Sequence, residues 1–231
     1  MSATTKGIFV TGTDTGVGKT VIAGALAVAA RNAGRRGAVL KPVETGCAGN
    51  PPVAADAEFL ALCAGTSAED AVLWKLRAPL APAVAAFTEQ VELSTDRIVQ
   101  KVSSLASLSD IVIVEGAGGL RVPITWEEDY LDLAVKLGAQ VVLVARAGLG
   151  TINHTRLSLD ALRRKDVPVQ GVVLNASTQP SGLHDEHVHS SNLHVLRHLA
   201  PLDRFEAVPY IEGGASSRCL RVAELVPWLL E

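Results

Sequence analysis

The fold is decided by the stretch Gly12-Thr13-Asp14-Thr15-Gly16-Val17-Gly18-Lys19-Thr20. An apolar run at residues 7–10 precedes it, and an alanine-rich segment with helical spacing of its apolar residues follows it. The order strand, glycine-rich turn, Lys-Thr and helix is typical of a phosphate-binding loop. Its glycines let backbone N–H groups turn inward around phosphate oxygens, and the helix dipole adds positive potential. The stretch predicts nucleotide binding, with Lys19 at the β- and γ-phosphates and Thr20 on Mg²⁺.

The spacing of this loop departs from the common pattern G-x-x-x-x-G-K-[ST]. That pattern places its first glycine at Thr13, whereas the nearest glycine is Gly12, one residue earlier. The alternative interpretation is a glycine-rich turn that arose by chance. Because Gly18-Lys19-Thr20 stands where a strand passes into a helix, nucleotide binding is favoured.

Composition excludes several classes of function. The chain has 231 residues, 48% of them apolar and 19% charged, which predicts a single globular domain over residues 1–231. Its net charge is −3 and no basic block stands out, so we expect neither a nucleic acid nor a membrane as partner. The first residues lack the apolar core of a signal peptide. With only three scattered cysteines, a cytoplasmic location is expected.

Short apolar runs recur along the chain, and stretches with helical spacing separate them. The runs show no in/out alternation, as expected for strands that are covered on both faces. Strands that alternate with helices predict an α/β protein with a three-layer, P-loop NTPase-like fold, in which helices cover both faces of a mostly parallel sheet. The expected strands are residues 7–10, 37–40, 110–114, 140–145 and 168–174, with a shorter candidate at 206–209.

Ligands of such sheets bind beyond the carboxyl ends of the strands, which directs attention to the polar residue after each run. Lys41 follows the second run. It either supplies a second positive charge for phosphoryl transfer or is a lysine that is simply solvated at a strand end. Glu115 follows the third run and precedes Gly116-Ala117-Gly118-Gly119, which suits a Mg²⁺ ligand better than a plain acid before a turn. Asn175 follows the fifth run, where its amide matches the adenine edge or simply stabilises a turn.

Two helix starts are further candidates. Asp56 opens an expected helix, and from the residues alone an ordinary helix N-terminal acid is favoured over a metal ligand. Residues 148–154 follow the fourth run and open another helix. Their free N–H groups would bind an anion such as a carboxylate, while the alternative is a glycine turn capped by Thr151 or Asn153.

Four motifs taken together resemble the dethiobiotin synthetase family of the biotin pathway. Their order and spacing agree over essentially the whole chain, and the length also fits. The motifs are Thr11 to Thr20, Lys41-Pro42-Val43-x-Thr45-Gly46, Val114-Glu115-Gly116-Ala117-Gly118-Gly119 and Gly150-Thr151-Ile152-Asn153-His154.

The resemblance implies an ATP- and Mg²⁺-dependent cyclo-ligase that makes dethiobiotin from 7,8-diaminopelargonic acid and CO₂. One substrate amine takes up CO₂ as a carbamate. A carbamate oxygen then attacks the γ-phosphate of ATP, which gives a carbamic–phosphoric anhydride. The second amine displaces phosphate, and the cyclic urea closes. The resemblance also implies a homodimer with the substrate site at the subunit interface.

The resemblance further implies a role for each matched residue. Lys41 and Lys19 would be the catalytic residues, stabilising the phosphoryl charge, with Lys41 also near the carbamate. The Mg²⁺ ligands would be Thr20, Asp56 and Glu115, which favours the metal interpretation of Asp56. The ATP site would comprise Gly16, Val17, Gly18, Lys19, Thr20, Val21, Asp56, Glu115, Gly116, Ala117, Gly118, Asn175, Pro209, Tyr210 and Ile211. The substrate site would comprise Thr45 and Gly118, with Gly150, Thr151, Ile152 and Asn153 from the partner subunit at the diamine's carboxylate.

Two departures and one alternative accompany this interpretation. Family members often have Asn-Asp where this chain has Asn175-Ala176, which predicts relaxed nucleotide selectivity. Some members have an acid where this chain has Gly16. The alternative function is a partition- or assembly-type P-loop ATPase that switches protein partners. Such ATPases usually carry a second lysine early in the loop, where this chain has Asp14.

Overall fold

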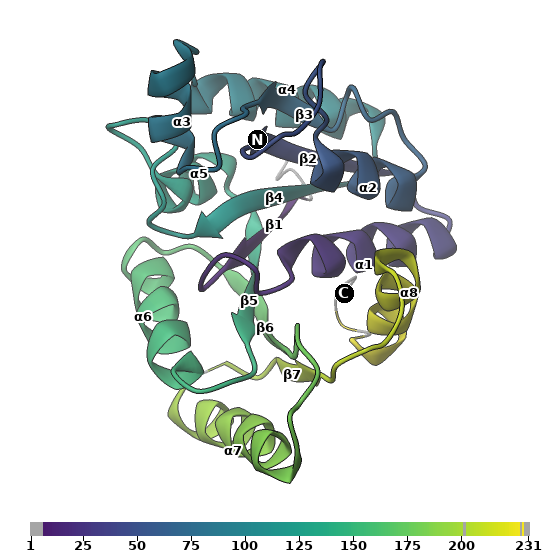
Figure 1. The fold of residues 1–231 in the computed structure, drawn as a ribbon, viewed down its shortest axis with the longest axis vertical. Coiled ribbons are helices and arrows are strands. Elements are labelled where there is room, and N and C mark those ends of the chain that lie inside the picture. The colour runs from purple at the N-terminus through teal and green to yellow at the C-terminus, as the bar shows by residue number, and fades with distance from the viewer. Residues whose placement is uncertain (1–6, 201, 227, 229–231) are drawn as a thin grey trace.

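The computed structural model describes residues 7–200, 202–226 and 228 (Figure 1). One sheet of seven strands runs through it in the order β3-β2-β4-β1-β5-β6-β7, and all neighbouring strands are parallel. The predicted α/β fold with a parallel sheet is therefore confirmed. The strands are β1 (Gly7–Gly12), β2 (Gly37–Glu44), β3 (Val72–Lys75), β4 (Ile111–Gly119), β5 (Gln140–Arg146), β6 (Val169–Asn175) and β7 (Phe205–Val208).

Helices cover both faces of the sheet and complete three layers. Apolar side chains of alternate strand residues pack in two separate cores, one on each face. The first core packs under α1 (Lys19–Asn32), α2 (Ala55–Ala64) and α8 (Ala215–Leu225), and α8 lies along α1 (Figure 1). The second core packs under α3 (Pro82–Glu89), α4 (Thr95–Leu108), α5 (Tyr130–Leu137), α6 (Thr151–Arg164) and α7 (Leu183–Leu199).

Two strands continue past the polar residues expected to follow them. Lys41 lies inside β2 and Glu115 lies inside β4, so both expected strand ends were placed too early. Strand β2 continues because the short edge strand β3, which the apolar pattern did not reveal, pairs with it from Lys41 to Glu44. Strand β4 continues because its last glycine, Gly119, pairs with Gly12 of β1 beyond a bulge.

Within the described ranges, no helix combines the length and the apolar character needed to cross a lipid bilayer.

Candidate active site

The predicted phosphate-binding loop joins β1 to α1. Its turn ends at Gly18, where φ is 97°, a left-handed conformation that favours glycine. A Cβ atom at Gly18 would also lie 2.1 Å from the side-chain nitrogen of Asn175, so glycine is required there on two grounds. Helix α1 has no side-chain cap and no acid in its first turn. Its first N–H groups are therefore available to an anion, as the sequence predicts.

Lys41 and Glu115 are neighbours on adjacent strands. The register pairs Leu40 of β2 with Val114 of β4, which places the next residue of each strand side by side. The Lys41 ammonium donates a 2.9 Å hydrogen bond to Glu115 Oε1, and the Thr20 hydroxyl donates another of 2.9 Å to the same oxygen. Both charged side chains are buried. The structure thus brings three predicted site residues from three elements to one point.

Asp56 joins this group through an ion pair with Lys41. It stands in the first turn of α2, whose N-cap residue, Ala54, has no side chain that can accept a hydrogen bond. Glu44 of β2 takes over this role from outside the helix. Its carboxylate accepts hydrogen bonds from the backbone N–H groups of Asp56 and Ala57, both at 3.0 Å. Glu44 therefore fixes the helix start that carries Asp56.

The two lysines have pKa values that differ in direction. Burial lowers the pKa of Lys19 below its usual value, and the neighbouring carboxylates do not offset this. Burial also acts to lower the pKa of Lys41, but the charges of Glu115 and Asp56 outweigh it and hold that pKa above its usual value. Lys41 therefore remains an ammonium group throughout the physiological pH range. The Lys19 ammonium donates a hydrogen bond to the carbonyl of Asp14, across the loop, at 2.9 Å.

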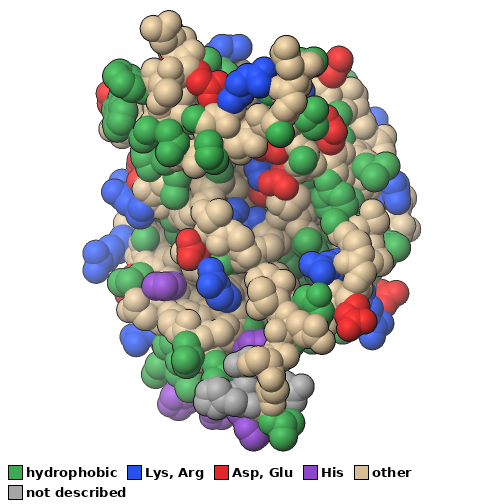
Figure 2. All heavy atoms as spheres, viewed as in Figure 1, with side chains coloured by type: hydrophobic (Ala, Val, Ile, Leu, Met, Phe, Trp, Pro, Cys, Tyr) green, Lys and Arg blue, Asp and Glu red, His purple; other side chains and the backbone are tan. Residues whose placement is uncertain are grey.

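A cavity of about 700 Å³ holds these groups. Figure 2 shows acidic and basic side chains together in a depression near the middle of one face. The predicted residues that line the cavity are Gly16, Gly18, Lys19, Thr20, Lys41, Thr45, Asp56, Glu115, Ala117 and Gly118. Two others, Val17 and Gly116, lie behind the wall, where Val17 is fully buried and Gly116 packs against the ring of Phe9.

A smaller pocket adjoins this cavity and gathers the residues predicted to hold the base. It is lined by Val21, Asn175, Pro209, Tyr210 and Ile211, together with others. The amide of Asn175 donates to the carbonyl of Val17 at 2.9 Å, so one of its hydrogens is already engaged. Its oxygen and second hydrogen remain for a base. The expected pairing with both adenine atoms is therefore compatible with the loop contact.

The oxygen atoms around Glu115 fit a Mg²⁺ ion as ligands. Glu115 Oε2 is buried and has no hydrogen-bond partner among the described residues, which is costly unless a cation or donor approaches it. The Thr20 hydroxyl and the Asp56 carboxylate supply further hard oxygens in the same cavity. Among the described residues, no group of three or more His, Cys, Asp or Glu side chains forms a complete metal cage. A Mg²⁺ ion at these oxygens would take its remaining ligands from phosphate oxygens and water, as is usual for this ion.

The predicted carboxylate-binding turn lies apart from this cavity. Gly150 has a φ of 86° and is the uncapped N-terminus of α6, and Asn153 is exposed. No residue from Gly150 to Asn153 lines the cavity of its own chain. The turn is held by the buried Asn192 of α7, whose amide donates to the carbonyls of Ala147 and Gly148 at 3.0 and 3.1 Å.

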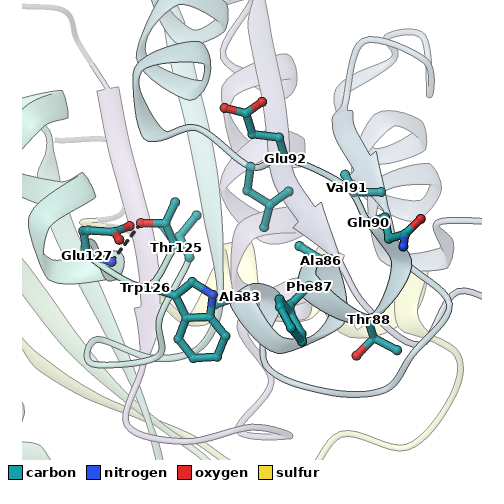
Figure 3. Close-up of a pocket in the computed structure, with 12 residues that line it drawn as sticks. Ala83, Ala86, Phe87, Thr88, Gln90, Val91, Glu92, Thr125, Trp126 and Glu127 are labelled. Atoms are coloured by element: carbon teal, nitrogen blue, oxygen red, sulfur yellow. Dashed lines mark hydrogen bonds between the residues drawn. The ribbon is translucent and has the colours of Figure 1, made fainter.

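A second large cavity is separate from the predicted site (Figure 3). It has a volume of about 860 Å³ and lies between α3 and the turn at residues 124–127. Phe87 and Trp126 stand at its edge with their ring centroids 6.2 Å apart, edge to face. None of the predicted site residues lines it. The nucleotide interpretation therefore belongs to the smaller, more charged cavity.

Sequence reasoning did not find three residues that shape the site: Glu44, Asn192 and Arg218. Asn192 lies 45 and 44 positions from the carbonyl groups that it contacts. Glu44 lies 12 and 13 positions from the N–H groups that it holds, and Arg218, which lines the cavity, lies 8 positions from Tyr210, but neither belongs to a recognisable motif. An indirect signal exists for Glu44, because a helix that starts at Ala54-Ala55 without a capping side chain needs a cap from elsewhere. Asn192 and Arg218 leave no comparable trace in the sequence.

Comparisons with known proteins decide the family. Residues 6–216 match a family described as an AAA domain. The ATP-dependent dethiobiotin synthetase BioD of Anaeromyxobacter sp. (strain Fw109-5) is 47% identical over 75% of this chain and 78% of its own length. The enzyme of the same name from Thermodesulfovibrio yellowstonii is 34% identical over 89% of both chains. The chain belongs to the dethiobiotin synthetase family. The resemblance drawn from the four motifs is confirmed, and with it an enzyme of the ATP-dependent ligase class.

A solved structure bears on the fold of this dethiobiotin synthetase family member. The signal recognition particle receptor FtsY from Elizabethkingia anophelis superposes with a TM-score of 0.54 at 16% identity, over the whole of this chain and 67% of that chain. At this identity the likeness concerns the fold alone. It agrees with the P-loop NTPase-like architecture that the sequence predicts.

Proposed function

We propose that this chain closes the cyclic urea of dethiobiotin from 7,8-diaminopelargonic acid, CO₂ and ATP. The observation that carries the proposal is the group formed by Lys41, Glu115 and Thr20 beside the phosphate-binding loop. It joins a buried ammonium to metal-binding oxygens in one cavity. Relatives named ATP-dependent dethiobiotin synthetase align with most of this chain and support dethiobiotin as the product.

The proposed reaction has three steps. One substrate amine adds to CO₂, loses a proton and becomes a carbamate. A carbamate oxygen then forms a bond to the γ-phosphorus, and the bond to the bridging oxygen of ADP breaks. Finally, the second amine attacks the carbonyl carbon of the anhydride, the bond from that carbon to the phosphate oxygen breaks, the amine loses a proton, and the ring closes with release of phosphate.

The charges in the cavity address the main obstacle to the second step, which is that two anions must meet. At a separation of 4 Å and an effective dielectric constant of about 20, each pair of unit charges repels by about 4 kcal/mol. Lys19 lies in the loop that would hold the triphosphate, and Lys41 faces the same cavity from β2. Their positive charges stabilise the approach of the carbamate and the phosphoryl group, where charge redistributes in the transition state.

Thr20, Asp56 and Glu115 are proposed to hold Mg²⁺. When bound, this ion would neutralise triphosphate charge and orient the γ-phosphate. Glu44 contributes by holding the start of α2, so that Asp56 stays directed toward Lys41. Thr45 lines the same cavity and is proposed to contact the diamine or its carbamate.

The diamine's carboxylate is proposed to bind residues Gly150 to Asn153 of a partner subunit. The support is that this turn presents an uncapped helix start and does not line the cavity of its own chain. A homodimer would place the turn of one subunit at the cavity of the other. The proposed active site thus requires two copies of the chain.

The experiment is incubation of the chain with 7,8-diaminopelargonate, labelled bicarbonate, ATP and Mg²⁺. The proposal predicts acid-stable label in a cyclic urea, with one ADP formed for each urea. Carbamates lose CO₂ in acid, so the label distinguishes ring closure from carbamate formation alone. ATP hydrolysis without acid-stable label would contradict the proposal and favour a switch-type ATPase.

A further inference from the structure

Arg218 of α8 stands between the two adjoining pockets of the nucleotide site. It lines the phosphate cavity and also the smaller base pocket, and only Gly18 and Ser177 share this property among the lining residues. A nucleotide with its phosphates on the loop and its base beside Tyr210 has to pass this point. The parts that join a base to the β-phosphate are the ribose and the α-phosphate.

The guanidinium group of Arg218 is held in place from one side. Its central carbon lies 5.3 Å from the centroid of the Tyr210 ring, a cation–π contact, and Nη2 lies 3.5 Å from the Tyr210 hydroxyl. Helix α8 is itself anchored by Cys219 and Val222, which are fully buried. The arginine is thus positioned before any ligand arrives.

The charge of Arg218 is only partly satisfied within the described part of the chain. Its Nε atom is buried and has no hydrogen-bond partner, and no described carboxylate forms an ion pair with it. Guanidinium groups stay charged in proteins, and an unpaired buried donor carries a desolvation penalty. An anionic ligand at this point would satisfy it with charge-assisted hydrogen bonds.

We propose that Arg218 binds the α-phosphate of the nucleotide, a contact outside the phosphate-binding loop. Of the nucleotide parts that pass between the two pockets, the α-phosphate alone is charged. The fork of guanidinium N–H groups matches phosphate oxygens. This inference rests on the proposed nucleotide-dependent function and adds a binding residue to it.

The test compares ligands that differ by one phosphate. Adenosine, AMP and ADP are titrated by calorimetry into the full-length wild-type chain, Arg218→Met, Arg218→Lys and a control, Arg221→Met. Arg221 lies on the same helix, but it is exposed and paired with Glu224. Methionine keeps much of the apolar length of arginine and removes the charge.

We expect Arg218→Met to weaken the binding of AMP and of ADP by about tenfold or more. The affinity for adenosine should change by less than about twofold. Arg218→Lys should recover part of the loss, and Arg221→Met should match the wild type. The ratio of AMP to adenosine affinity is measured within one variant, so a general folding defect would not change it. An unchanged ratio in Arg218→Met, with wild-type ADP binding intact, would overturn this inference alone. Failure of the wild type to bind ADP would overturn both this inference and the proposed function.

Discussion

Lys41 and Glu115 lie 74 positions apart in the sequence, yet Lys41 Nζ is 2.9 Å from Glu115 Oε1. The parallel pairing of β2 with β4 brings them together, and both are buried. A buried ion pair of this kind contributes little net stability, because desolvation offsets the attraction, whereas loss of one partner is costly. Its placement in the cavity beside the phosphate-binding loop is better explained by a role in binding charged ligands.

The first prediction concerns Glu115→Gln. This change keeps the shape of the side chain but removes the negative charge proposed to face Mg²⁺. We expect a higher Mg²⁺ concentration for half-maximal turnover, by about tenfold or more, because a hard cation prefers carboxylate oxygen over amide oxygen. The measurement is a Mg²⁺ titration of cyclic urea formation at saturating ATP. An unchanged Mg²⁺ requirement would exclude Glu115 as a ligand.

The second prediction concerns the turn before α6. A diamine that lacks the carboxylate should bind at least about tenfold more weakly than 7,8-diaminopelargonate, because it would lose the charge-assisted contacts proposed at Gly150 to Asn153. Asn192→Ala should weaken the binding of 7,8-diaminopelargonate and leave the binding of the diamine without a carboxylate almost unchanged. The reason is that Asn192 holds that turn through the Ala147 and Gly148 carbonyls. Equal loss for both diamines would count against carboxylate binding there.

The third prediction concerns nucleotide selectivity. Ala176 is buried at the base pocket and offers no side-chain hydrogen bond to read the base. Because Asn175 alone then reads the base, we expect the preference for ATP over GTP and CTP in kcat/KM for urea formation to be about tenfold smaller than in Ala176→Asp, the worth of a single polar contact. Ala176→Asp should increase the preference among the three. An equal preference for ATP in the wild type and in Ala176→Asp would show that Ala176 has little influence.

The fourth prediction concerns a structural ion network. Glu128 accepts hydrogen bonds from Lys136 and Thr95, and Lys136 also pairs with Asp96 at 2.7 Å. These contacts, chiefly those from Lys136 and Thr95, hold the pKa of Glu128 below its ordinary value of 4.5. The folded state therefore favours the charged form. The resulting stability is fully present above pH 4.5 and is lost as the pH falls through the folded-state pKa.

Glu128→Gln should accordingly lower the melting temperature at pH 7 by about 2–4 °C, for a loss of about 1 kcal/mol. The gap between the variant and the wild type should narrow as the pH falls below 4.5. Glu127→Gln, at an exposed neighbouring position, serves as the control and should change little. A gap that stays constant with pH would refute the assignment of the stability to the Glu128 charge.

Local patterns in the sequence predict the phosphate-binding loop and the parallel sheet well, because both features depend on residues that are close together in the sequence. The glycine turn before Lys19 and the uninterrupted apolar runs need no distant information. The short strand β3 was not predicted, because four residues at a sheet edge are too few to form a clear apolar pattern. Its absence from the prediction also shortened β2, and so Lys41 was expected after a strand instead of within one.

The candidate site was predicted in its charged residues but not in the groups that orient them. The motifs pointed to Lys41 and Glu115, the family resemblance added Asp56, and the structure gathers all three. Glu44 holds the helix start beneath Asp56 through backbone N–H groups, and Asn192 holds a turn through backbone carbonyls. These contacts depend on how the folded elements meet, and neither residue belongs to a motif. Only the uncapped start of α2 gives an indirect signal for Glu44.

The most direct test of the central role of Lys41 is a paired measurement on Lys41→Ala, with Lys75→Ala on the neighbouring strand β3 as the control. Mg²⁺-ATP affinity, measured by calorimetry, should stay within about threefold of the wild type, which also shows that the variant folds. Formation of acid-stable labelled urea should fall by about a hundredfold or more, because the variant lacks the charge proposed to stabilise phosphoryl transfer. Lys75→Ala should keep both properties. Full urea formation by Lys41→Ala would contradict the account.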